Sequence, residues 1–409
     1  MNNLPIDLIQ YYIFDKLDFI TEIRFRQICK RLNRINVHNM FYHINKKCLN
    51  ILSDNILLNY QKIKYLDTTN NEKIKNINYM THLQILNASR GCAINDDGIK
   101  NLNLIELDAF ANKNITNVNH MTNLQILNAS WSTINDNGIK NLNLIKLYAS
   151  NNTQITNIDH MTNLQILDIH GNCGIDDNSI KNLNLIELNA SGNSKITNVN
   201  HMTKLRILDA SYNCGLDDNG IKDLNLTELC ILNNGKITNV NHMAKLQILN
   251  ASGISSKLGN SGINNINLIN LNVSFNSKIT NVNHMTNLQI LDASNSCEID
   301  DNGIKDLNLI QLNAYNNRKI TNVNHMSNLK ILDASGHYCG INDNGIKNIN
   351  LTELNAGHNP KITNINHMNN LKILNASGKT SGLDDNGIKD LNLIKIIAFY
   401  NPKIIDSCI

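Results

Sequence analysis

Histidine is the residue whose type and spacing most suggest chemistry in this sequence. A His-Met pair recurs every 40 to 42 residues, at His120, His160, His201, His242, His284, His325 and His367. If each step spans two coils of a stacked repeat, neighbouring copies lie ~10 Å apart. A metal ion needs its nitrogen ligands at ~2 Å. The pattern therefore predicts solvated surface histidines copied with a repeat, and no metal site.

Paired aspartates raise the possibility of calcium binding. They begin at Asp176, Asp217, Asp300 and Asp384. A calcium loop also needs an acidic residue at its end, and lysines follow these pairs instead. We therefore expect turns that cap short helices. The sequence has no C-x-x-C, H-E-x-x-H or P-loop motif, and no Ser, His and Asp stand apart from the repeat. We expect no enzyme, no cofactor and no metal.

The cysteines and the sequons favour an intracellular protein. Four of the nine cysteines share one turn position, at Cys92, Cys173, Cys214 and Cys297. They are at least two coils apart, and ~10 Å is too far for a disulfide. Asn-Ala-Ser sequons at Asn87, Asn128, Asn250 and Asn375 would attract glycans in a secreted protein. No apolar stretch reaches 18 residues, and the first residues carry three Asp and lack a basic leader, so we expect no signal peptide in them. We expect a cytoplasmic protein that does not enter membranes. The nucleus is the other compartment that fits these features.

A shorter repeat predicts the structural elements that position these residues. The pattern Leu-x-x-Leu-x-Ala occurs about every 20 residues and gives 17 coils from Ile63 to Ala398. Two apolar residues around one outward residue predict a short strand. The remainder of each coil predicts a tight turn and a helical return. Asn nine residues into most coils, as at Asn112, Asn172 and Asn213, should satisfy backbone groups of its own coil and of the next.

From residue 63 to 409 the chain resembles the leucine-rich-repeat family, with Ala where the family's strand usually ends in Leu. The resemblance implies an α/β solenoid, a horseshoe of about 17 short coils of 20–22 residues with its strands on the concave face. The last coil ends in "KIIDSCI" without a polar cap, so we expect it to fray or to bind a partner.

Residues 1–45 lack the repeat and show helical spacing of apolar residues. The order Leu-Pro, Asp-Leu, Ile-Phe, Leu and Ile-Cys-Lys-Arg-Leu over Leu4 to Tyr42 resembles an F-box, without the Trp that the family often has near Leu32. The resemblance implies a helical domain that binds a Skp-type adaptor and, through it, a cullin. The implied contact residues are Leu4, Pro5, Leu8, Ile9, Ile13, Leu17, Ile28 and Leu32. Residues 46–62 are expected to form a linker or N-terminal cap. Alternatively, the first helices only cap the solenoid.

The outward strand positions predict a partner-binding face. Ten acids occupy them against Lys146 and Lys395, so a basic docking segment should fit. Departures from the usual Ile, Asn, Asp and Ser there add anchor candidates. The predicted contact residues are Glu106, Phe110, Trp131, Tyr148, His170, Glu187, Asp209, Tyr212, Glu228, Phe275 and Tyr315. A simpler explanation is that the acids only solubilise an exposed sheet, and that the aromatic departures are drift at tolerant positions.

Together these features predict the substrate-recognition subunit of a Skp–cullin–F-box ubiquitin ligase, monomeric outside that complex. The alternative is a non-enzymatic interaction scaffold. A net charge of +3 argues against a general nucleic-acid binder. The Asn-rich composition is similar to such proteins encoded by giant DNA viruses of amoebae, which would place it in the host cytoplasm.

Overall fold

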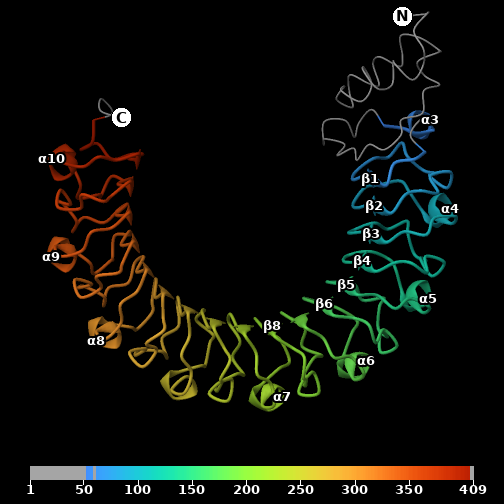
Figure 1. Cartoon of the computed structure of the whole chain (residues 1–409), viewed down its shortest axis with the longest axis horizontal. Coiled ribbons are helices and arrows are strands. Elements are labelled where there is room, and N and C mark those ends of the chain that lie inside the picture. The colour runs from blue at the N-terminus through green and yellow to red at the C-terminus, as the bar shows by residue number, and fades with distance from the viewer. Residues whose placement is uncertain (1–51, 59–60, 406–409) are drawn as a thin grey trace, which may run out of the picture. The chain divides into compact units, whose positions relative to one another are not determined.

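The computed structural model describes residues 52–58 and 61–405. The chain divides into two compact units, Met1–Lys195 (unit 1) and Ile196–Ile409 (unit 2). Within each unit, the strands lie along one side and the short helices along the other (Figure 1). The side formed by the strands is called the strand face below.

Unit 1 contains seven strands and four helices among its described residues. The strands are β1 (Tyr65–Asp67), β2 (Ile85–Asn87), β3 (Glu106–Asp108), β4 (Ile126–Asn128), β5 (Lys146–Tyr148), β6 (Ile166–Asp168) and β7 (Glu187–Asn189). The helices are α3 (Asp54–Leu57), α4 (Asp96–Ile99), α5 (Asp136–Ile139) and α6 (Asp177–Ile180). All consecutive strands of unit 1 pair in parallel.

Unit 2 repeats the same plan in its described residues. Its strands are β8 (Ile207–Asp209), β9 (Glu228–Cys230), β10 (Ile248–Asn250), β11 (Asn270–Asn272), β12 (Ile290–Asp292), β13 (Gln311–Asn313), β14 (Ile331–Asp333), β15 (Glu353–Asn355), β16 (Ile373–Asn375) and β17 (Lys395–Ile397). Its helical segments are α7 (Asp218–Ile221), the 3₁₀ turn η4 (Asn260–Gly262), α8 (Asp301–Ile304), α9 (Asp343–Ile346) and α10 (Asp385–Ile388).

These coils form the leucine-rich-repeat solenoid predicted from the sequence. In β3 the middle residue, Leu107, is fully buried, and the two flanking residues face outward. Paired strands are 20 to 22 residues apart in sequence. Since one strand buries only one side chain, each coil depends on its neighbours for a core. Among the described residues, no helix is long and apolar enough to cross a membrane.

Buried asparagines form a ladder at the turn after every second strand. Asn112 Nδ2 donates to Ala88 O at 2.7 Å, and its Oδ1 accepts from the backbone N–H groups of Asn114 and Ile115. The bonded neighbour is thus the preceding coil, so the prediction that Asn bonds the next coil was wrong. The prediction was wrong for Asn172 and Asn213, which are exposed. In those coils the turn is longer, and a buried cysteine, Cys173 or Cys214, takes the inward position.

The acidic turns are built as helix caps, as predicted, and the second acid has an additional role. Asp217 accepts a hydrogen bond from the backbone of its own helix, α7. Asp218 reaches the next coil, where it accepts from both the backbone N–H and the hydroxyl of Thr238. The carboxylates therefore join consecutive coils.

The repeated histidine also has a structural partner. His242 Nε2 lies 3.0 Å from the carbonyl oxygen of Ile221, the last residue of α7. A carbonyl only accepts, so this nitrogen carries the proton. The same contact recurs at His120, His284, His325 and His367. The histidine is therefore more than a solvated surface residue, because it bonds the end of the preceding coil's helix.

Residues 52–58 cover the start of the first coil. Leu52 and Leu57 are fully buried. Asp54 accepts from the backbone N–H groups of Lys75 and Asn76, as the joining aspartates do elsewhere. These residues fall within the predicted linker or cap, 46–62, which stays a prediction. Residues 1–45, with the predicted F-box contacts, lie outside the described residues.

The last coil retains its structural bonds in the described residues. Asn401 is buried, and its Nδ2 donates to Ala376 O at 2.9 Å. Ile394, Phe399, Tyr400 and Ile405 nevertheless expose most of their surface. Whether this coil frays stays a prediction, and residues 406–409 lie outside the described part.

Candidate protein-binding face

Three positions per coil lie along the strand face and are called outward below, although a serine at the third is buried in several coils, as at Ser130. The first and second are the first and third residues of the strand, and the third lies two residues further on. Each coil takes the number of its strand. In the even-numbered coils these three positions are nearly constant, with Ile at the first, Asn or Asp at the second and Ser at the third, except for His170. Odd-numbered coils vary, with Glu106-Asp108-Phe110 on β3 and Lys146-Tyr148-Ser150 on β5. Variation is therefore concentrated in every second coil.

The second outward position is mainly structural. Asp108 Oδ1 accepts from the backbone N–H of Phe110 at 2.8 Å, closing a turn at the strand end. Asn makes the same bond in sister coils, as at Asn128. This explains the Asn-Ala-Ser sequons, because the Asn side chain bonds the Ser backbone. Six of the ten predicted acids close such turns: Asp67, Asp108, Asp168, Asp209, Asp292 and Asp333.

The other four acids are glutamates at the first outward position. They are Glu106, Glu187, Glu228 and Glu353. None of their side chains makes a hydrogen bond or ion pair with a described residue, unlike the aspartates. The predicted acidic face therefore has a structural part, at the second position, and an unpaired part, at the first.

In unit 1 the acids act on two tyrosines. The pKa of Tyr65 is raised by burial and then by Asp67, Glu106 and Asp108. The pKa of Tyr148 is raised by burial and then by Glu187, Asp168 and Glu106. Burial also raises the pKa of Asp108, whereas the nearby Arg90 lowers it. The field over this unit's strands is therefore negative and incompletely compensated.

Three predicted aromatic anchors occupy strained backbone positions. Trp131, Tyr212 and Phe275 have φ values of 57°, 58° and 59°. Sister coils mostly place Gly or Asn at this left-handed position. A side chain with Cβ there costs roughly 1–2 kcal/mol. Trp131 and Tyr212 nevertheless expose 50% and 52% of their surface, so burial does not offset the strain. Whether these aromatics bind a partner stays a prediction.

The remaining predicted anchors lie at the other outward positions. Tyr148 is at the second position, and Phe110, His170 and Tyr315 are at the third. The Arg90 guanidinium lies 5.8 Å from the centre of the Phe110 ring. Coils 3 to 6 thus each carry one aromatic departure, at Phe110, Trp131, Tyr148 and His170.

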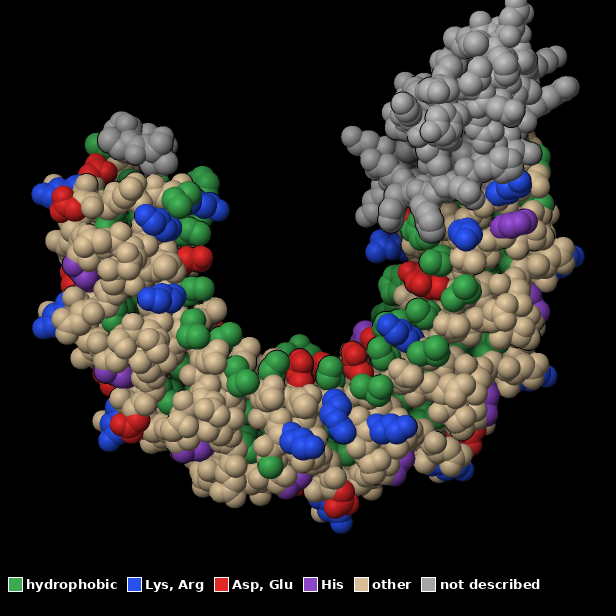
Figure 2. Space-filling model, viewed as in Figure 1, with side chains coloured by type: hydrophobic (Ala, Val, Ile, Leu, Met, Phe, Trp, Pro, Cys, Tyr) green, Lys and Arg blue, Asp and Glu red, His purple; other side chains and the backbone are tan. Residues whose placement is uncertain are grey.

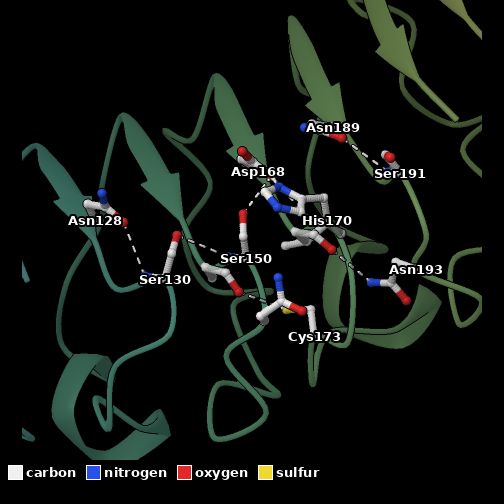
Figure 3. A network of polar contacts seen from close by, with 12 residues as sticks. Asn128, Ser130, Ser150, Asp168, His170, Cys173, Asn189, Ser191 and Asn193 are labelled. Carbon is white, nitrogen blue, oxygen red and sulfur yellow. Dashed lines mark hydrogen bonds and ion pairs between the residues drawn. The ribbon is translucent and has the colours of Figure 1, made fainter. Parts of the chain in front are cut away.

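His170 belongs to a polar network that includes Ser and Asp (Figure 3). Its Nδ1 lies 2.9 Å from Asp168 Oδ1, and the Ser150 hydroxyl donates to the same oxygen at 2.8 Å. Nucleophilic catalysis needs the histidine between the hydroxyl and the acid. Here the aspartate is between them and Ser150 is buried. The network therefore fixes the His170 ring instead of activating the serine.

Sequence reasoning missed a hollow on the strand face of unit 2. It lies over β13 to β16 and has a volume of about 280 Å³. Outward side chains from these four strands line it, among them Gln311, Ile331, Asp333, Glu353 and Ile373. Hydrophobic and acidic side chains also lie along the strand side of each unit (Figure 2). A local depression depends on relative side-chain lengths on adjacent strands, which the repeat pattern alone does not show.

No protein-family model and no curated protein sequence matches the chain. Among solved structures, a functional domain of InlJ from Listeria monocytogenes is 19% identical, with a TM-score of 0.45, covering 83% of this chain and 68% of that chain. A chain of the mouse RP105/MD-1 complex is 15% identical, with a TM-score of 0.48, covering 85% and 64%. A chain of the yeast Rad7–Elc1 complex is 18% identical, with a TM-score of 0.37, covering 85% and 89%. The fold assignment therefore rests on this chain's own coils.

Proposed function

We propose that this chain is a target-binding receptor whose strand face holds a protein with a basic docking segment. The observation that carries the proposal is the set of first-position glutamates, which face outward without a partner among the described residues. Isoleucines at the first position of the even-numbered coils lie beside them, as the exposed Ile248 does beside Glu228. Charge would orient the partner, and apolar contact with these isoleucines would hold it.

The proposal extends to a ligase role through residues 1–45, on the resemblance of Leu4 to Tyr42 to an F-box. In this role the N-terminal domain binds a Skp-type adaptor and cullin, and the strand face holds the target near the ligase. The chain does no chemistry itself, since it only raises the target's effective concentration.

One structural observation supports a separate role for residues 1–45. The start of the solenoid is already covered by α3, with Leu57 buried and Asp54 bonded to the first coil. We propose that residues 52–58 act as a cap. This reduces the need for the alternative in which the first helices only shield the core.

The ligase role is tested by adaptor binding. Purified full-length chain is mixed with a Skp-type adaptor, and the complex is measured by size-exclusion chromatography. Replacing Leu8 and Leu17 by Asp should abolish the complex while the circular dichroism spectrum of the repeat stays unchanged. Equal adaptor binding by both proteins, or none by the original chain, would leave only the interaction scaffold.

A further inference from the structure

The first outward position in unit 1 forms a row with a simple period. Neighbouring strands are hydrogen-bonded in register, so Glu106, Ile126, Lys146, Ile166 and Glu187 face one another in order. The isoleucines occupy the even coils and the charged residues the odd coils. Because strands lie ~4.8 Å apart, successive charged positions are ~9.6 Å apart.

This spacing selects the conformation of a ligand that crosses the strands. A polyproline II chain repeats every three residues, or ~9.3 Å. A β-strand presents one face every ~6.7 Å, and a helix returns to the same face after two turns, ~10.8 Å. Over two steps, the mismatch is ~0.6 Å for polyproline II and ~2.4 Å for the helix. A β-strand returns to the same face every ~6.7 Å, which does not match the ~9.6 Å between charged positions. The row therefore favours a polyproline II segment.

The charges in this row alternate in sign and have no partner among the described residues. Glu106 is negative, Lys146 positive and Glu187 negative, and none of these side chains makes an ion pair with a described residue. Ile126 and Ile166 lie between them and offer apolar contact to the intervening residues. We infer that unit 1 recognises a polyproline II segment with basic, acidic and basic residues at positions i, i+3 and i+6. The inference rests on the proposed function, whose docking segment it specifies.

Backbone recognition is also available beside the row. A polyproline II chain has no internal hydrogen bonds, so its carbonyl groups accept from a partner. Asn128 and Asn189 use Oδ1 to close their turns. Their Nδ2 groups make no hydrogen bond to a described residue and can donate to such carbonyls. Asn128 and Asn189, labelled in Figure 3, are the last residues of β4 and β7, two residues after Ile126 and Glu187 of the row.

The test exchanges the charges on both partners. Fluorescent peptides Lys-Pro-Pro-Glu-Pro-Pro-Lys and Glu-Pro-Pro-Lys-Pro-Pro-Glu are titrated with the full chain and with its triple variant Glu106→Lys, Lys146→Glu, Glu187→Lys. Anisotropy should show that the original chain prefers the first peptide by about tenfold, since three attractive pairs become repulsive. The triple variant should prefer the second peptide. A single Glu187→Lys variant should reduce the preference if the triple variant fails to fold.

Two further peptides separate this inference from the proposed function. Lys-Pro-Pro-Lys-Pro-Pro-Lys carries the basic charge without the pattern, and Lys-Ala-Glu-Ala-Lys carries the pattern at strand spacing. If the all-basic peptide binds best and charge reversal does not invert the preference, the pattern is wrong while a basic docking segment stands. Tighter binding of the strand-spaced peptide also overturns the inference, as does binding of neither patterned peptide.

Discussion

Replacing Asn317 by Ala should strongly destabilise unit 2. Asn317 is fully buried. Its Nδ2 donates to Ala293 O at 2.7 Å and to Ile299 O at 3.3 Å. Its Oδ1 accepts from the backbone N–H groups of Lys319 at 2.7 Å and Ile320 at 3.0 Å. The substitution therefore leaves four backbone groups without their partner.

The magnitude follows from these four hydrogen bonds. Each intramolecular bond contributes about 1 kcal/mol net, and a buried group left unpaired costs about 1–3 kcal/mol. The weakest of the four, to Ile299, is long, and water can enter the vacated space. We therefore expect a loss of about 4 kcal/mol in the free energy of unfolding, and local opening of the coils that Asn317 joins.

Urea denaturation gives the free energy, and hydrogen exchange locates the opening. Faster exchange should centre on residues 293–320, because those backbone groups lose their partner. The matched control is Asn213→Ala, since Asn213 is an exposed asparagine in the corresponding turn. The control should change stability by less than about 0.5 kcal/mol. A loss below about 1 kcal/mol for Asn317→Ala would refute the ladder's structural role.

Three further predictions concern single side chains. Ser381 has a buried hydroxyl without a partner in the described part of the chain, so Ser381→Cys should raise the thermal midpoint. Ser256→Cys, which loses a bond from the ladder, should not. The Asp108→Asn variant should be more stable than the original chain at pH 7, because burial raises the pKa of Asp108 and Asn can close the same turn. This gain in stability should shrink as the pH falls through the pKa of Asp108, where the carboxylate becomes neutral. An unchanged gain at low pH would contradict the prediction. Burial raises the pKa of Cys297 to about 12. Mass spectrometry after iodoacetamide treatment at pH 8 should therefore find Cys297 about a thousandfold less modified than an ordinary thiol. Rapid labelling of Cys297 in the native protein would contradict its burial.

Much of the fold could be predicted because near-identical coils repeat each local signal. Strand, turn and helical return follow from the spacing of Leu and Ile, and Asp before Asn-Gly predicts the helix cap. The ladder was misassigned at Asn172 because the turn of that coil is longer, which moves the inward position to Cys173. Counting residues from the strand does not detect that shift.

The site was less predictable than the fold because its residues have two kinds of role. From the sequence, Glu106 and Asp108 are equivalent acids, yet only Asp108 closes a backbone turn. The left-handed conformation of Trp131 is also hidden, since Trp seldom adopts it. Gly and Asn at the same position in sister coils are the signal that could have indicated it.

The central claim is that the strand face binds the target, and one comparison tests it most directly. Tagged full-length chains are captured from cells at 0.15 M salt, and the co-purifying proteins are quantified. The test variant replaces the first-position glutamates by Gln: Glu106, Glu187, Glu228 and Glu353. The control removes the same amount of charge from the return side of the coils. It replaces four aspartates by Asn, which sister coils carry at these positions: Asp159, Asp223, Asp306 and Asp390. We predict that a basic partner is retained by the control and reduced at least tenfold by the test variant. Equal loss in both variants, or none in either, would contradict the account.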